Sequence, residues 1–170
     1  MSEINDKNIK SLLSLKDDGW INDFTTNCYA FALGLDIPEN EICKNAYQLG
    51  FIAAYKFGLQ IEEILSLTLE DRFLLDLKAL KIAYYEIEGD QAAGWYYLGN
   101  YICHYWDVLL YSNGKDFHFA RRNYNGELYN KIGYLGIPIK CEETVEYLSQ
   151  YTLVRKYRLR YWEKDNNLWL

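Results

Sequence analysis

Apolar residues recur at helical spacing in the first half of the chain and in a different pattern in the second. The helical spacing predicts helices over residues 4–15, 42–57 and 68–80. Another short helix is expected from Cys28, because polar residues that favour a helix N-cap lead directly into an apolar run that ends at Gly34. The first half of the chain is therefore predicted to be mostly helical.

The second half is rich in aromatic and β-branched residues separated by turn residues, which is typical of strands. A tight hairpin turn is expected at Asn113-Gly114, and a short helix around 142–149. The predicted strands are 81–88, 102–111, 116–122, 127–132 and 151–162. Helices followed by an antiparallel meander predict an α+β fold, with a helical part over about 1–80 and a sheet part over about 81–170 of a single domain, 1–170.

Composition and charge narrow the classes of function. With 170 residues, 50% of them hydrophobic and 17% aromatic, the chain can bury a core and is not expected to be disordered. Its net charge of −6 gives no support to a nucleic-acid partner. The first residues are polar and precede no apolar segment, so we expect no signal peptide, no membrane partner and a cytoplasmic location. A basic face on the last strand (Lys156, Arg158 and Arg160) is expected to be solvated and to discourage edge pairing, with the binding of an anionic ligand or partner as the alternative.

The four cysteines are widely spaced and form no C-x-x-C pair, so free thiols are expected. The two histidines, His104 and His118, have no ligand-like spacing to these cysteines. Nucleotide-binding glycine motifs are also missing from the sequence. We therefore expect no metal and no cofactor.

The chemistry that the sequence favours is that of a cysteine nucleophile. Cys28 falls in the first turn of a predicted helix, where free backbone N–H groups and the helix dipole favour a thiolate of low pKa. His118 is the candidate base, on a strand whose alternation places His118, Ala120 and Arg122 on one face and Phe117, Phe119 and Arg121 on the other. His104 is expected to be a satisfied histidine of the sheet, with a reserve role as base.

A base of this kind needs a polar side chain that orients it, and the next strand offers Glu127 and Asn130. We prefer Asn130, because it lies further from the turn and nearer the level of His118 across the hairpin. For an oxyanion hole, the backbone N–H of Cys28 is one donor, and the side-chain amide of Asn22 or Asn27 is the candidate for the second.

Two blocks of this sequence resemble small bacterial and phage-encoded papain-like hydrolases. Residues 27–33 (NCYAFAL) are similar to their N-C-Y-A-[YF]-A-L segment, and residues 116–133, with DFHFARR, NG and YNKIG, resemble their D-[YF]-H-[WF]-x-R…[DN]-G…W-x-H-K-x-G block. The resemblance implies a papain-like fold related to cell-wall amidase-type domains. It also implies Cys28 as nucleophile, His118 as base and Asn130 at the third polar position, where many relatives carry His.

Three functions are compatible with these observations. The first is a thiol hydrolase that cleaves an amide or isopeptide-type bond in a peptide or protein substrate. The second is a catalytically silent papain-like fold that acts as an inhibitory or binding protein. The third is an acyltransferase, which uses the same thiol and histidine but passes the acyl group to an amine instead of water. The sequence indicates neither the substrate nor the oligomeric state.

Overall fold

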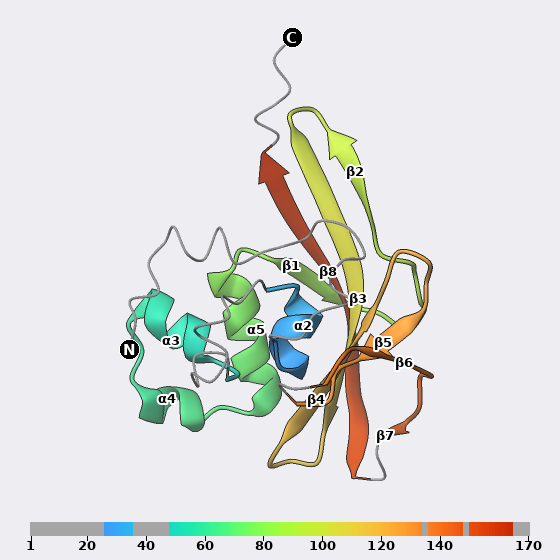
Figure 1. Cartoon of the computed structure of the whole chain (residues 1–170). Helices are drawn as coiled ribbons and strands as arrows, with labels where there is room; N and C mark the ends of the chain where they lie inside the picture. Colours follow the sequence, from blue (N-terminus) through green and yellow to red (C-terminus); the bar gives the residue numbers. More distant parts are fainter. Residues whose placement is uncertain (1–25, 36–47, 134–135, 148–149, 165–170) are drawn as a thin grey trace.

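The structure, a computed structural model, describes residues 26–35, 48–133, 136–147 and 150–164. In these ranges it has the expected α+β organisation, since every helix precedes every strand (Figure 1). The helices are α2 (Cys28–Leu33), α3 (Phe51–Phe57), α4 (Ile61–Leu65) and α5 (Leu69–Ala79). The helix predicted over 4–15 lies outside the described residues.

Helix α5 follows the sequence signals closely. The Thr68 hydroxyl caps it by accepting from the Asp71 backbone N–H at 3.1 Å, as the prediction for 68–80 requires. The prediction of a helix over 42–57 is wrong at residues 48–50, because α3 begins only at Phe51. Gly50 has a φ of 88°, and a Cβ there would lie 2.5 Å from the side chain of Ile64. This left-handed residue ends any continuous helix through it.

Within the described residues, eight strands form one antiparallel sheet. They are β1 (Ala83–Glu86), β2 (Gly94–Leu98), β3 (Tyr101–Ser112), β4 (Phe117–Arg122), β5 (Leu128–Asn130), β6 (Ile139–Cys141), β7 (Glu146–Tyr147) and β8 (Tyr151–Lys164). The strand order is β1-β8-β3-β4-β5-β6, with β2 paired to β3 and β7 paired to β8. The predicted meander therefore holds for β3, β4 and β5. Strand β6, which the sequence does not predict, extends it by one strand, and the last strand returns to lie between β1 and β3.

The short helix predicted around 142–149 is wrong for the described part of that segment, which contains β7. The Leu153 N–H donates to the Val145 carbonyl at 2.7 Å, and the Tyr147 ring packs on Tyr111 with ring centres 5.2 Å apart. These contacts with the sheet outweigh a weak local helical preference.

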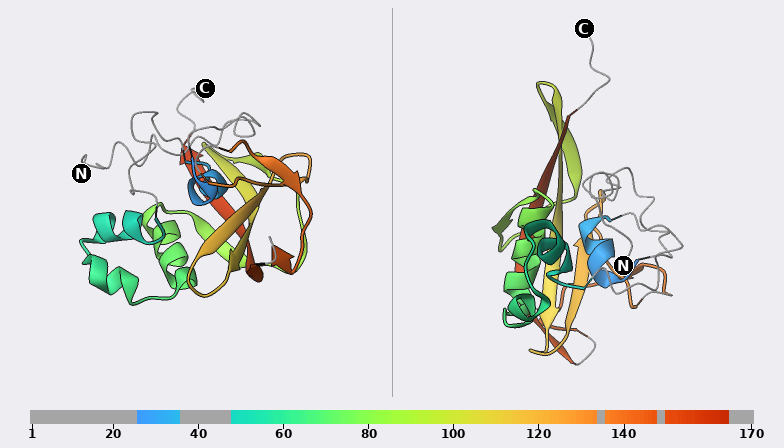
Figure 2. Two further views of the ribbon diagram at one scale, coloured as in Figure 1. Left: turned by 60° about the horizontal axis from the view of Figure 1, so that its bottom comes forward. Right: turned by 90° about the vertical axis from the view of Figure 1, so that its left-hand side faces the viewer.

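The helices gather on one side of the sheet and bury its main core there (Figures 1 and 2). A buried carboxylate, Asp76 of α5, joins three of the helices across this core. It accepts hydrogen bonds from the Tyr29 hydroxyl of α2 at 2.5 Å and from the backbone N–H groups of Gly50 and Ala53 at 2.7 Å each. Asp76 therefore fixes the position of α2, the helix that carries Cys28.

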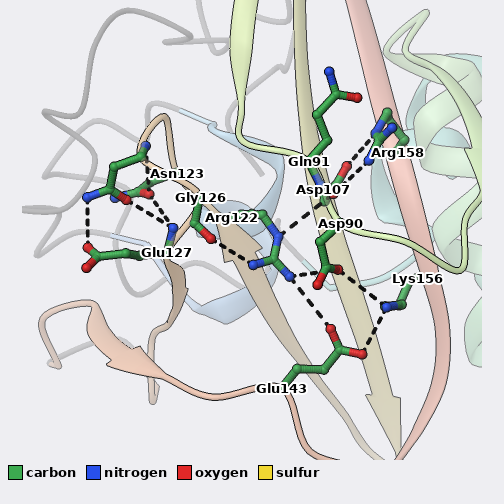
Figure 3. A network of polar contacts seen from close by, with 11 residues as sticks. Asp90, Gln91, Asp107, Arg122, Asn123, Gly126, Glu127, Glu143, Lys156 and Arg158 are labelled. Carbon is green, nitrogen blue, oxygen red and sulfur yellow. Dashed lines mark hydrogen bonds and ion pairs between the residues drawn. The ribbon is translucent and has the colours of Figure 1, made fainter.

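The opposite side of the sheet combines a small apolar cluster with a network of ion pairs. Buried Asp107 on β3 binds the Arg158 guanidinium at 2.7 and 3.1 Å (Figure 3). Around it, Asp90 and Glu143 each lie within ion-pair distance of Arg122 and Lys156 (Figure 3). The expectation of a solvated basic face is therefore wrong, because Lys156 and Arg158 are used in these pairs and Arg160 lies over the Tyr85 ring.

Candidate functional site

Cys28 is the first residue of α2, as the sequence predicts. Asn27 is the N-cap, and its Oδ1 accepts from the Ala30 backbone N–H at 2.8 Å. The helix ends at Gly34, which has a φ of 69°. The side chain of Asn27, a candidate for the oxyanion hole, therefore has a structural role, because its oxygen caps the helix. The other candidate, Asn22, lies outside the described residues.

The Cys28 thiol is half-buried and protonated at neutral pH. Desolvation by burial, with a smaller contribution from the charge of Asp116, raises its pKa to about 12. The backbone N–H groups of Phe119, Tyr29 and Cys28 itself act in the opposite direction. The expected low-pKa thiolate is therefore wrong for this structure, because the cost of desolvating the anion exceeds the stabilisation that the helix start provides.

One of the three N–H groups at the Cys28 sulfur comes from the strand that carries His118. Strand β5 pairs with β4 only from Ala120 to Arg122, and Phe119 is the residue just before this ladder. The Phe119 N–H acts on the sulfur, so α2 is placed against β4 at this point. The thiol is thus held at the backbone of the residue next to His118.

The side chains of β4 alternate as predicted. Phe117 and Phe119 pack against Tyr29 of α2, with ring centres 6.2 and 5.4 Å apart. His118 points to the other side of the sheet, where its ring stacks on Tyr147 with centres 4.7 Å apart and an interplanar angle of 9°. The structure therefore brings the Cys28 sulfur to the backbone beside His118, while the imidazole lies against Tyr147.

Asn130 lies beside His118, and Glu127 does not. Asn130 pairs with Ala120 across the β4–β5 ladder, on the same face as His118, whereas the Glu127 carboxylate binds Lys140 at 2.6 Å at the surface. The Asn130 Nδ2 donates to the Ile139 carbonyl at 3.3 Å. Its Oδ1 is buried and has no hydrogen-bond partner among the described residues. The side-chain amide of Asn130 is thus placed where its oxygen can accept a hydrogen bond from an imidazole N–H.

His118 is neutral at physiological pH. Burial lowers its pKa to about 4, against smaller upward contributions from the Asn130 side chain and the charge of Asp116. Its Nε2 is buried and forms no hydrogen bond with the part of the chain that the structure describes. The neutral imidazole has a ring nitrogen free to accept a proton, but a pKa of about 4 makes it a weak base in this resting structure.

Sequence reasoning missed three further side chains at this site. The Tyr151 hydroxyl donates to Asp116 at 2.7 Å, and the Asp116 charge acts on both Cys28 and His118. Cys141 of β6 lies close to Asn130, whose side chain lowers the thiol pKa against the larger effect of burial. Asp116 could have been found, since it precedes Phe117 and His118 in the recognised block. The approach of Cys141 depends on the pairing of β5 with β6, which no local pattern indicates.

His104 lies at the other end of β3 from the site, with its Nε2 3.4 Å from Glu163. Among the described residues, no three His, Cys, Asp or Glu side chains are placed to hold a metal ion. None of the helices in the described ranges is long and apolar enough to cross a membrane. Comparisons with protein-family models, with curated proteins and with solved structures find no match to this chain.

Proposed function

We propose that this protein is a cytoplasmic thiol hydrolase of the papain-like type, with Cys28 as nucleophile, His118 as general base and Asn130 orienting the imidazole. Its substrate would be an amide or isopeptide-type bond in a peptide or protein. One observation carries the proposal. The Cys28 sulfur lies among backbone N–H groups of the α2 start and of Phe119, and Phe119 is the chain neighbour of His118.

The resting pair in this mechanism is a thiol and a neutral imidazole. His118 takes the thiol proton as the sulfur attacks the carbonyl carbon of the substrate, so that the S–C bond forms and the carbonyl oxygen becomes an oxyanion. N–H groups at the start of α2 stabilise that charge. The imidazolium then protonates the leaving amine as the C–N bond breaks, and water releases the acyl group.

This sequence of steps requires a movement of the His118 side chain. In the structure the ring stacks on Tyr147, and it must turn toward the edge of β4 to meet the sulfur. Asn130, on the strand next to β4, offers its free Oδ1 to the ring nitrogen that remains protonated. The geometry therefore supports a site that is completed when substrate binds at the start of α2.

The test is acylation by a simple activated ester, p-nitrophenyl acetate, followed by peptide mapping by mass spectrometry. We expect one acetyl group on Cys28, and His118→Ala should slow its formation by about 10²–10⁴-fold. Cys141→Ser is the matched control, because this second half-buried thiol lies near the same amide. Acylation of Cys141 in place of Cys28, or an unchanged rate in His118→Ala, would refute the assignment. Added amine distinguishes transfer from hydrolysis through the product formed.

A second candidate function, a binding or inhibitory protein without turnover, is favoured by one observation. The imidazole packs on Tyr147, and burial leaves the thiol protonated. Under this alternative, Cys28→Ala retains the full biological effect of the protein, whereas the hydrolase loses it. The same acylation experiment then finds no acetyl group on Cys28.

A further inference from the structure

The sheet extends beyond the helices as a three-stranded arm (Figure 1). We use this name for β2, residues 101–105 of β3 and residues 160–164 of β8. In the arm, β3 is the central strand, with β2 paired on one side and β8 on the other. The arm lies at the far end of β3 from the candidate active site, since β4 pairs with residues 108–112.

The arm exposes an unusual amount of aromatic surface. Trp95 and Tyr97 are each 54% exposed and contact each other on one face of β2, with ring centres 5.4 Å apart. Leu98 is 60% exposed, and Tyr96 packs on Trp162 on the other face. Scattered apolar side chains on a surface need no explanation, but a contiguous group of this size is typical of an interaction site.

The outer edge of β2 is also open. Among the strands that the structure describes, β2 pairs only with β3. Edge strands of soluble proteins usually carry charges or proline, which prevent pairing with another chain. Residues 94–106 contain no Asp, Glu, Lys, Arg or Pro. The β2 edge therefore lacks the features that normally prevent an edge strand from pairing with a strand of another chain.

We propose that two copies of this chain associate by antiparallel pairing of their β2 edges, which forms one continuous sheet across a twofold axis. The strand is self-complementary about Tyr96. Pairing centred there places Trp95 opposite the Tyr97 of the second copy on one face, and Tyr96 opposite its own equivalent on the other. Aromatic pairs across antiparallel strands are favourable, and the twofold interface forms the Trp95–Tyr97 pair twice and the Tyr96–Tyr96 pair once, at the axis.

Charge and area both favour a second copy as the occupant. Each chain has a net charge of −6, but the paired strands contribute no charge of their own, so no like charges meet at the interface. The antiparallel arrangement also places the two helical bodies at opposite ends of the shared sheet. Six large apolar side chains of the arm are exposed: Trp95, Tyr96, Tyr97, Leu98, Tyr101 and Trp162. Together they offer roughly 500–600 Å² per chain, or about 1,000–1,200 Å² in total, which is the lower limit of a specific interface.

The proposal is tested on the full chain by sedimentation velocity over protein concentrations of about 1–100 μM. We expect a concentration-dependent dimer. The double substitution Trp95→Lys/Tyr97→Lys places four cations around the proposed axis and should weaken the dimer at least about 100-fold. Leu65→Lys on α4 is the control, because Leu65 is equally exposed, at 54%, and lies outside the arm. Circular dichroism establishes that each variant is folded.

A second variant tests the same interface if the lysine substitutions prevent folding. Tyr96→Cys, made in a Cys103→Ser background because Cys103 lies opposite position 96 in the same chain, places two thiols directly opposite each other at the axis, within the range of a disulfide bond. Mild oxidation should link the chains through position 96, as mapped by mass spectrometry, while Leu65→Cys should not cross-link. A wild-type chain that is monomeric throughout the concentration range overturns the proposal. So does a dimer that the folded lysine variant leaves unchanged.

Discussion

The buried carboxylate of Asp76 makes a pH-dependent contribution to stability that can be isolated by one substitution. Burial raises the pKa of Asp76 from 3.8 to about 6, although the Tyr29 hydroxyl and the backbone N–H groups oppose the shift. Because the folded pKa lies above the unfolded one, the folded protein binds the proton more tightly. The resulting stability is present in full below pH 4 and is lost as the pH rises through 6.

The magnitude follows from the size of the shift. A shift of about two units corresponds to about 3 kcal/mol between the two protonation states. Asp76→Asn removes the titration but keeps an oxygen that accepts from Tyr29 and Gly50, while its NH₂ group, at the position of Oδ1, faces the Ala53 backbone N–H. We therefore expect the substitution to destabilise the protein at pH 4 by about 3 kcal/mol more than at pH 7.5.

Urea unfolding at several pH values between 4 and 7.5 measures this difference directly. Comparison with the wild type cancels the contributions of the other carboxylates, and Glu62→Gln, at an exposed position of α4, controls for the loss of one negative charge. If the Asp76→Asn and wild-type stabilities keep a constant difference over this pH range, the reasoning is refuted. The free energy would then not depend on the ionisation of Asp76.

Three further predictions address the site and the ion-pair network. Because the pKa of Cys28 is about 12, its alkylation by iodoacetamide at pH 8 should be about 10³-fold slower than that of a free thiol. The alkylation rate should keep increasing with pH up to pH 11, and a rate that levels off below pH 9 would contradict this prediction. Asp116→Asn removes a charge that raises the pKa of His118, so the NMR titration of that imidazole should move to lower pH, and an unchanged titration would argue against their proximity. Asp107→Asn breaks the buried pair with Arg158 and should cost about 3–5 kcal/mol in urea unfolding; Glu143→Gln, at the exposed edge of the network, should cost at most about 1 kcal/mol.

Local signals in the sequence were sufficient for the parts of the site that depend on one element or one hairpin. Asn27 and Gly34 delimit α2 through capping chemistry, which acts within a single turn. The faces of β4 follow from the period of two, so His118 and Phe119 are separated as predicted. The position of Asn130 follows from the length of the hairpin between β4 and β5.

The parts that the sequence could not predict depend on distant packing. Strand β8 pairs with β3 along its whole length, and the ion pair of Asp107 with Arg158 depends on that register. The high pKa of Cys28 is a second case, because a helix start by itself lowers a thiol pKa and the opposing desolvation comes from the sheet packed against α2. No pattern within α2 contains that information.

The neutral charge states of Cys28 and His118 limit how this site can work. A preformed thiolate–imidazolium pair requires the thiol pKa to lie below that of the imidazole, whereas here the values are about 12 and about 4. Burial disfavours both the Cys28 thiolate and the His118 imidazolium, so transfer of the thiol proton to the imidazole is unfavourable by itself. The transfer becomes favourable only when a further charge that stabilises the imidazolium forms in the same step. A substrate oxyanion at the N–H groups of the α2 start stabilises the imidazolium that appears in the same step. In the proposed hydrolase, substrate binding therefore has to precede activation of the thiol, which is why acylation by an ester is a stronger test of the site than alkylation.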